Sequence, residues 1–108
     1  MNDEVIHIKQ RLAALETADW QPEIIRRHGF QFRLVKVAGD FGWHTHEYSD
    51  KVLLAIEGAI AVDFADGRSL HLNAGDMAVV PKNVSHRPHS EHGALIVLIE
   101  LPEPDGAA

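Results

Sequence analysis

Hydrophobic residues follow a helical period at the start of the chain. Ile8, Leu12 and Leu15 recur at the spacing that places side chains on one face of a helix. The pattern stops where the segment from Thr17 to Pro22 begins. The sequence therefore predicts a short N-terminal helical segment within residues 1–22, which packs on the domain that follows.

From residue 23 the period changes to that of short strands, in which apolar and polar residues alternate. The runs that carry this pattern read EIIRRH, FQFRLVKVAG, WHTHEY, KVLLAIEG, AIAVDFADG, RSLHLNAGD, MAVVP, SHRPH and ALIVLIEL. Turn signals divide most of them, among them Glu57-Gly58 and Asp66-Gly67. Many short strands with such turns predict an antiparallel barrel over residues 23–102, followed by a flexible tail at 103–108.

Composition narrows the class of protein. The 108 residues fit one domain, and the formal net charge of −6 is opposite to the bias of proteins that bind nucleic acid. The chain contains no cysteine, which excludes disulfides and thiolate metal sites. The N-terminus lacks the pattern of a secretory signal, and the longest apolar run, at 94–101, is too short to span a bilayer. We therefore expect a cytoplasmic protein with no nucleic-acid or membrane partner.

Histidine is the residue type that points to chemistry. Six of the eight histidines fall between residues 44 and 92. His44 and His46 project from one face of a strand, where two imidazoles reach one metal ion, although a single strand histidine is more often solvated or hydrogen-bonded. His86, at the start of a later strand, is the candidate third ligand. We expect the remaining histidines, at positions 7, 28, 71, 89 and 92, at the surface.

Other side chains are assigned by alternation alone. Tyr48 shares the face of His44 and His46, so it is a candidate hydrogen-bond donor near the metal, with core packing as the alternative. Arg33 shares a face with Val35, but a solvated arginine is the more common outcome. Phe64 and Met77 are expected in the core.

Two spaced motifs resemble those of the cupin superfamily, specifically its small single-domain members. The first family motif contains His-x-His, a glutamate and, seven positions after that glutamate, a glycine; the second contains Gly, Pro-x-Gly and a histidine. The matching positions here are His44, His46, Gly58, Gly75, Pro81 and His86. The resemblance implies an all-β, double-stranded β-helix (jelly-roll) barrel, a homodimer, and a divalent metal (Zn, Fe, Ni, Mn or Cu) at His44, His46 and His86.

The departure from the family pattern lies at the glutamate, because Lys51 occupies the position of that metal ligand. Four interpretations remain open. The metal binds through the three histidines; Asp50 supplies the missing oxygen; Lys51 turns away, pairs with an acid such as Glu47 or Glu57, or helps to hold an anion; or no ion binds and the histidines line a plain ligand pocket.

Function is less determined than fold, because one fold carries many activities. We expect the site to bind or convert a small polar or anionic metabolite. As an enzyme the protein would be a metal-dependent oxygenase, isomerase or lyase. The alternative is a non-catalytic module that binds a small ligand or a structural metal.

Overall fold

The structure is a computed structural model that describes residues 5–102. It contains one short helix and six strands: α1 (Ile8–Ala13), β1 (Glu23–Arg27), β2 (Phe30–Asp40), β3 (Lys51–Phe64), β4 (Ser69–Asn73), β5 (Met77–Val80) and β6 (His86–Glu100). The expected all-β architecture with one short helix is confirmed. The tail at 103–108 lies outside the described residues.

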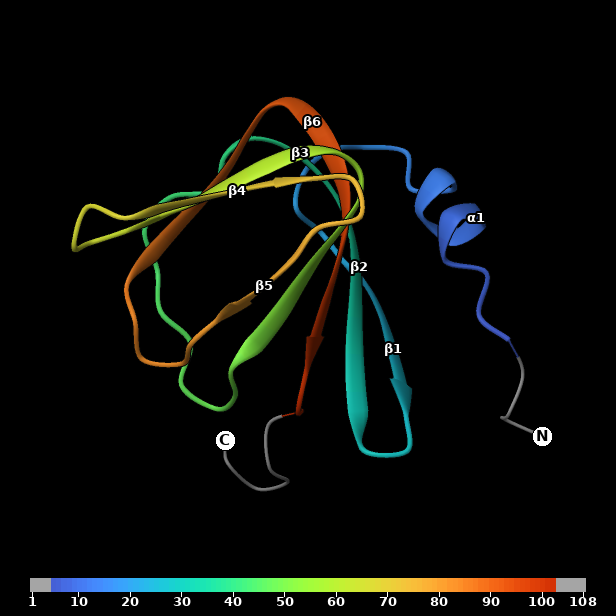
Figure 1. Ribbon diagram of the computed structural model, residues 1–108. Helices are drawn as coiled ribbons and strands as arrows, with labels where there is room; N and C mark the ends of the chain where they lie inside the picture. The colour runs from blue at the N-terminus through green and yellow to red at the C-terminus, as the bar shows by residue number, and fades with distance from the viewer. Residues whose placement is uncertain (1–4, 103–108) are drawn as a thin grey trace.

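The strands form one antiparallel sheet with the order β1-β2-β6-β3-β4, and β5 pairs with β3. Figure 1 shows that β3 and β6 bend along their length, so the sheet rolls up into a barrel. The rolled sheet therefore has an inner and an outer face, and the inner face encloses a pocket.

The long strands correct two predictions, since SHRPH and ALIVLIEL, expected as separate strands, belong largely to the single strand β6. The sequence predicted a turn at Glu57-Gly58 between two strands, but β3 runs through this point with irregular register against β6 between Ala55 and Ala61. Gly58 has a φ of +77°, and a Cβ atom there would collide with the carbonyl oxygen of Gly93. The glycine therefore allows a bulged bend rather than a chain reversal.

The segment expected to form the strand WHTHEY is also different. It contains only one isolated bridge, between His44 and His86, and no regular strand. Among the residues expected in the core, Phe64 is buried as predicted. The prediction for Met77 is wrong, because 66% of this residue is exposed on the short strand β5.

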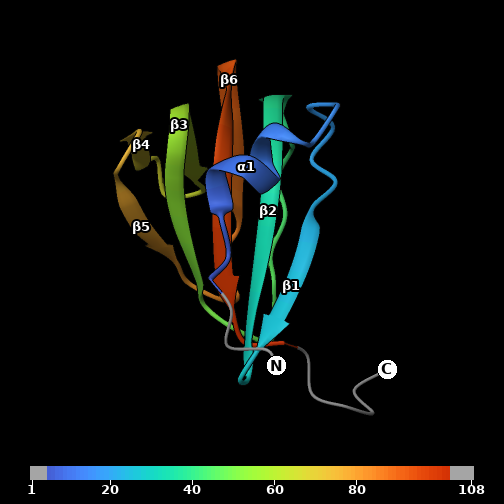
Figure 2. The same cartoon turned by 90° about the vertical axis from the view of Figure 1, so that its right-hand side faces the viewer.

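Two hydrophobic clusters lie on opposite faces of the sheet. Val35 and Leu53 belong to the cluster inside the barrel, whereas Leu34 and Val97 face outward. Helix α1 covers this outer cluster with Leu12, which is fully buried. Figure 2 shows the helix lying across β2 and β6. Burial of one leucine side chain contributes about 2 kcal/mol, and packing of this kind stabilises a helix too short to form alone.

No helix within the described part of the chain is long and apolar enough to cross a membrane.

Candidate functional site

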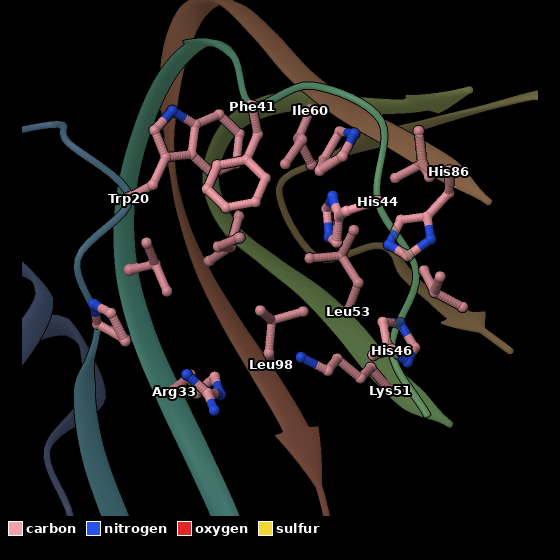
Figure 3. Close-up of a pocket in the computed structure, with 16 residues that line it drawn as sticks. Trp20, Arg33, Phe41, His44, His46, Lys51, Leu53, Ile60, His86 and Leu98 are labelled. Carbon is pink, nitrogen blue, oxygen red and sulfur yellow. The ribbon is translucent and has the colours of Figure 1, made fainter. Parts of the chain in front are cut away.

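A pocket of about 140 Å³ opens inside the barrel. Most of its wall consists of apolar side chains from the inner faces of the strands. Figure 3 shows the three predicted histidines on one side of this pocket and Arg33 on the other, with Lys51 beside His46 and its side chain extending toward Arg33. We call this cavity the inner pocket. Its lining residues are Trp20, Pro22, Arg33, Val35, Phe41, His44, His46, Lys51, Leu53, Ile60, Val62, Val80, His86, Pro88, Ile96 and Leu98.

Backbone pairing brings the histidines together. His44 and His86 exchange two hydrogen bonds across the isolated bridge, with N···O distances of 2.9 and 3.0 Å. The ring centroids of these two residues lie 4.4 Å apart, and those of His46 and His86 lie 5.0 Å apart. Three imidazoles from distant parts of the sequence therefore meet at one end of the inner pocket.

Each of the three rings has its Nδ1 atom within hydrogen-bond distance of a nearby backbone carbonyl. The carbonyls belong to Gly42 for His44 (3.2 Å), Ser49 for His46 (3.0 Å) and Val84 for His86 (2.9 Å). A carbonyl only accepts, so Nδ1 carries the proton and a neutral ring keeps its lone pair on Nε2. The Nε2 atom of His46 is buried and has no hydrogen-bond partner within the described residues.

The environment favours the neutral form of His46 and His86. Burial, together with the charges of Lys51 and His86, lowers the pKa of His46 to about 4, against the opposing bond to Ser49. Burial also lowers the pKa of His86 below its ordinary value. A neutral imidazole with a free Nε2 lone pair is the form that coordinates a metal.

The Nε2 atoms of the three histidines are available as metal donors, but they are not yet arranged around one point. Within residues 5–102, no group of three or more His, Cys, Asp or Glu side chains is placed to hold a metal ion as it stands. The His44 and His86 rings face each other at an interplanar angle of 56°. The three histidines therefore fit a metal ion as a donor set, and binding requires the rings to shift so that their Nε2 atoms share one point.

Lys51 is paired with an acid, although it lies close enough to His46 for its charge to lower the pKa of that ring. Its Nζ lies 3.1 Å from Oε1 of Glu100, not near Glu47 or Glu57 as the sequence suggested. Figure 3 shows the Lys51 side chain directed away from His46. The same carboxylate accepts hydrogen bonds at Oε2 from Arg33, at 2.8 Å, and from Gln31.

The Glu100 carboxylate is therefore the hub of a charged cluster. Its side chain is 6% exposed, against 32% for Arg33 and 21% for Lys51. Burial opposes ionisation of Glu100, but the hydrogen bonds and charges of Arg33 and Lys51 outweigh it, so the pKa lies below its ordinary value. We call Arg33, Lys51 and Glu100 the charged triad.

The other two candidates, Asp50 and Tyr48, do not line the inner pocket. Asp50 is exposed, and its Oδ1 accepts a hydrogen bond from the backbone N–H of Lys82 at 2.9 Å. Tyr48 is 45% exposed and does not line the inner pocket. It lines a second, more polar pocket of about 430 Å³, which shares Arg33, His46 and Lys51 with the inner one.

Sequence reasoning gave too little weight to three lining residues. Arg33 faces the inner pocket, as its alternation with Val35 allowed but did not require. Trp20 and Phe41 stack at the pocket with ring centroids 4.9 Å apart, and the indole N–H of Trp20 donates to the Ala38 carbonyl. Trp20 precedes the barrel strands, so no strand pattern could have placed it there.

Comparisons with known proteins agree with this architecture. The cupin domain family model matches residues 31–100. The solved structure of protein NMB1881 from Neisseria meningitidis is 67% identical, covers 92% of this chain and 100% of that one, and has a TM-score of 0.87. A cupin-2 domain containing protein from Shewanella frigidimarina is 34% identical over 91% of this chain and 95% of its own, with a TM-score of 0.83.

A curated relative matches over a shorter stretch. YdbB of Bacillus subtilis is 36% identical over 58 residues, which cover 54% of this chain and 51% of that protein. The chain thus spans about half the length of the curated relative that it matches.

Proposed function

We propose that this chain, which belongs to the cupin domain family, binds a divalent metal through Nε2 of His44, His46 and His86 and holds or converts a small polar or anionic metabolite there. The observation that carries the proposal is the set of three Nδ1 contacts to backbone carbonyls, which leaves every Nε2 lone pair available. Three imidazoles are an established donor set for zinc and also suit iron, nickel or copper.

Lys51 does not oppose this assignment as strongly as its position in the motif suggests. Two unit charges 4 Å apart interact by about 4 kcal/mol at an effective dielectric of 20, and a divalent ion doubles that figure. The Glu100 carboxylate, 3.1 Å from the Lys51 ammonium, offsets this repulsion. The lysine is thus part of a charged cluster and is not a misplaced metal ligand.

A bound ion would supply Lewis acidity or, for a redox-active metal, oxygen activation. His44, His46 and His86 would hold it by reorienting their rings. Apolar side chains such as Leu53 and Ile60 would exclude water from the ligand.

A second candidate function is ligand binding without turnover. No carboxylate side chain lines the inner pocket among the described residues, and Lys51 is paired with Glu100. A general acid or base beside the metal is therefore not evident, and this observation favours a binding module. Substrate-dependent oxygen uptake by the iron-loaded protein would argue against the module.

Zinc titration by calorimetry tests the metal site, with elemental analysis of the purified protein beside it. We expect His86→Ala to weaken zinc binding by about 100-fold or more, because one of three ligands is lost. His92→Ala is the matched control, since His92 lies on the same strand and its side chain is 88% exposed. Equal zinc affinity in wild type and His86→Ala would contradict the proposal.

We also propose a homodimer that pairs through the exposed edge strand β1, where Ile24 is 41% exposed. A single monomeric species in sedimentation at micromolar concentration would contradict it.

A cytoplasmic location is proposed on the absence of cysteine and is tested by cell fractionation.

A further inference from the structure

The charged triad carries more positive than negative charge. Arg33 and Lys51 line both the inner and the second pocket, whereas Glu100 lines the second pocket alone. One carboxylate therefore compensates two cations, and both cations face the inner pocket. A net positive charge remains at the wall of a mostly apolar cavity, where an incoming anion interacts strongly because little water screens it.

Arg33 also has unused hydrogen-bonding capacity. Within residues 5–102 its side chain contacts Glu100 through Nε alone. A guanidinium carries five N–H donors in a planar fork, so its two terminal amino groups remain for a second acceptor. Lys51 likewise has three donors, and one of them faces Glu100. Both side chains can therefore contact a second carboxylate while they keep the first.

The cavity between the charged triad and the histidines is apolar and small. Leu53, Ile96 and Leu98 line it. Its volume of about 140 Å³ is close to that of an apolar cavity that accepts a single benzene ring, which is about 150 Å³. The pocket thus suits a compact apolar body that has one charged group.

We propose that Arg33 and Lys51 form a carboxylate-binding subsite, so that the ligand of the inner pocket is a monocarboxylic acid whose apolar body is about the size of one six-membered ring. Glu100 holds the two cations in position. This inference rests on the proposed function and deepens it by naming the ligand class. The carboxylate subsite itself does not require a bound metal; only a contact between ligand and metal does.

The test compares benzoate with benzamide by calorimetry at neutral pH, using metal-free protein. The two probes share one ring and differ in charge, and without metal only protein cations can favour the anion. We expect benzoate to bind about tenfold more tightly than benzamide, because charge-assisted hydrogen bonds are the stronger ones. Lys51→Met and Arg33→Met should each remove most of this preference and leave benzamide binding within about twofold.

Lys82→Met is the control, since this lysine is exposed and lines neither pocket; it should keep the preference. Circular dichroism checks the fold of each variant, and if Arg33→Met does not fold, Lys51→Met and Lys51→Gln carry the test. Equal affinity for the two probes, a preference that survives in the Lys51 variants, or no measurable binding of benzoate would overturn the proposal.

The two proposals can fail separately. Zinc binding without a preference for benzoate would contradict the carboxylate subsite and support the metal site. A preference for benzoate without zinc binding does the reverse.

Discussion

The two polar regions of the inner pocket are held in different ways. The tautomers of His44, His46 and His86 are set by the backbone, because each Nδ1 lies within hydrogen-bond distance of a main-chain carbonyl. The charged triad is fixed by side chains alone, since Arg33 and Lys51 meet at one Glu100 carboxylate.

The two regions should therefore differ in how well they tolerate substitution of neighbouring side chains. Backbone contacts persist whichever neighbouring side chain is replaced, so the protonation pattern of the histidines should tolerate many substitutions. The charged triad depends on a single carboxylate, and a change there alters both the stability of the barrel and the charge offered to a ligand. Substitutions on each side should therefore have distinct signatures.

The largest effect is expected from Glu100→Leu. Two partly buried cations lose their shared counter-charge, and we expect the free energy of unfolding to fall by about 2–3 kcal/mol, less than for a fully buried pair because both cations keep some contact with water. Urea unfolding measures the change. Glu91→Leu is the control, because that side chain is 86% exposed. Equal stability of the two variants would show that the triad does not need its acid.

An intermediate effect is expected from pH at the imidazole side in metal-free protein. The pKa of His46 is about 4 in the folded chain against an ordinary 6.5, so between these values the unfolded chain binds more protons. Stability contributed by neutral His46 is complete above pH 6.5 and is lost as the pH falls toward 4. Because the ring is only partly buried, we expect a loss of about 1–2 kcal/mol.

Carboxyl groups such as Glu100 and Asp63, whose pKa values lie below the ordinary range, also lose stabilising charge in acid, at lower pH. The measurement is therefore the difference between wild type and His46→Gln in urea unfolding across pH 4–7. His46→Gln should show a smaller slope, and parallel curves would contradict the assignment.

The smallest effect is expected from Asp50→Ala. Its carboxylate accepts the Lys82 backbone N–H, so loss of that bond should cost about 0.5–1 kcal/mol of stability. Zinc affinity should stay within about twofold of wild type. A large loss of zinc affinity in calorimetry would instead make Asp50 the missing oxygen ligand.

Local pattern and motif spacing were enough to predict the barrel and the meeting of the histidines. His44 and His86 are 42 positions apart, but matched motifs specify where their strands return. The pairing of Lys51 with Glu100 could not be predicted, because it follows from the register of β3 on β6, in which Val52 lies opposite Ile99. That register is set by closure of the whole barrel and has no local signal.

Local signals also misled where one residue type serves two purposes. Gly58 has the positive φ of a turn residue, yet it lies inside a continuous strand. Met77 sits on a four-residue strand that pairs with β3, and alternation exposes it. In both cases the sequence identified an unusual position, and tertiary packing decided its meaning.

The continuous course of β3 and β6 limits how the pocket admits a ligand. Both strands bend through the rolled sheet and are hydrogen-bonded to each other along most of their length. The two halves of the barrel therefore cannot separate without breaking these hydrogen bonds. A ligand therefore enters beside the segments that flank the sheet and not between β3 and β6. Trp20 and Phe41 lie on such segments, outside the strands, and their rings pack together at the wall of the inner pocket.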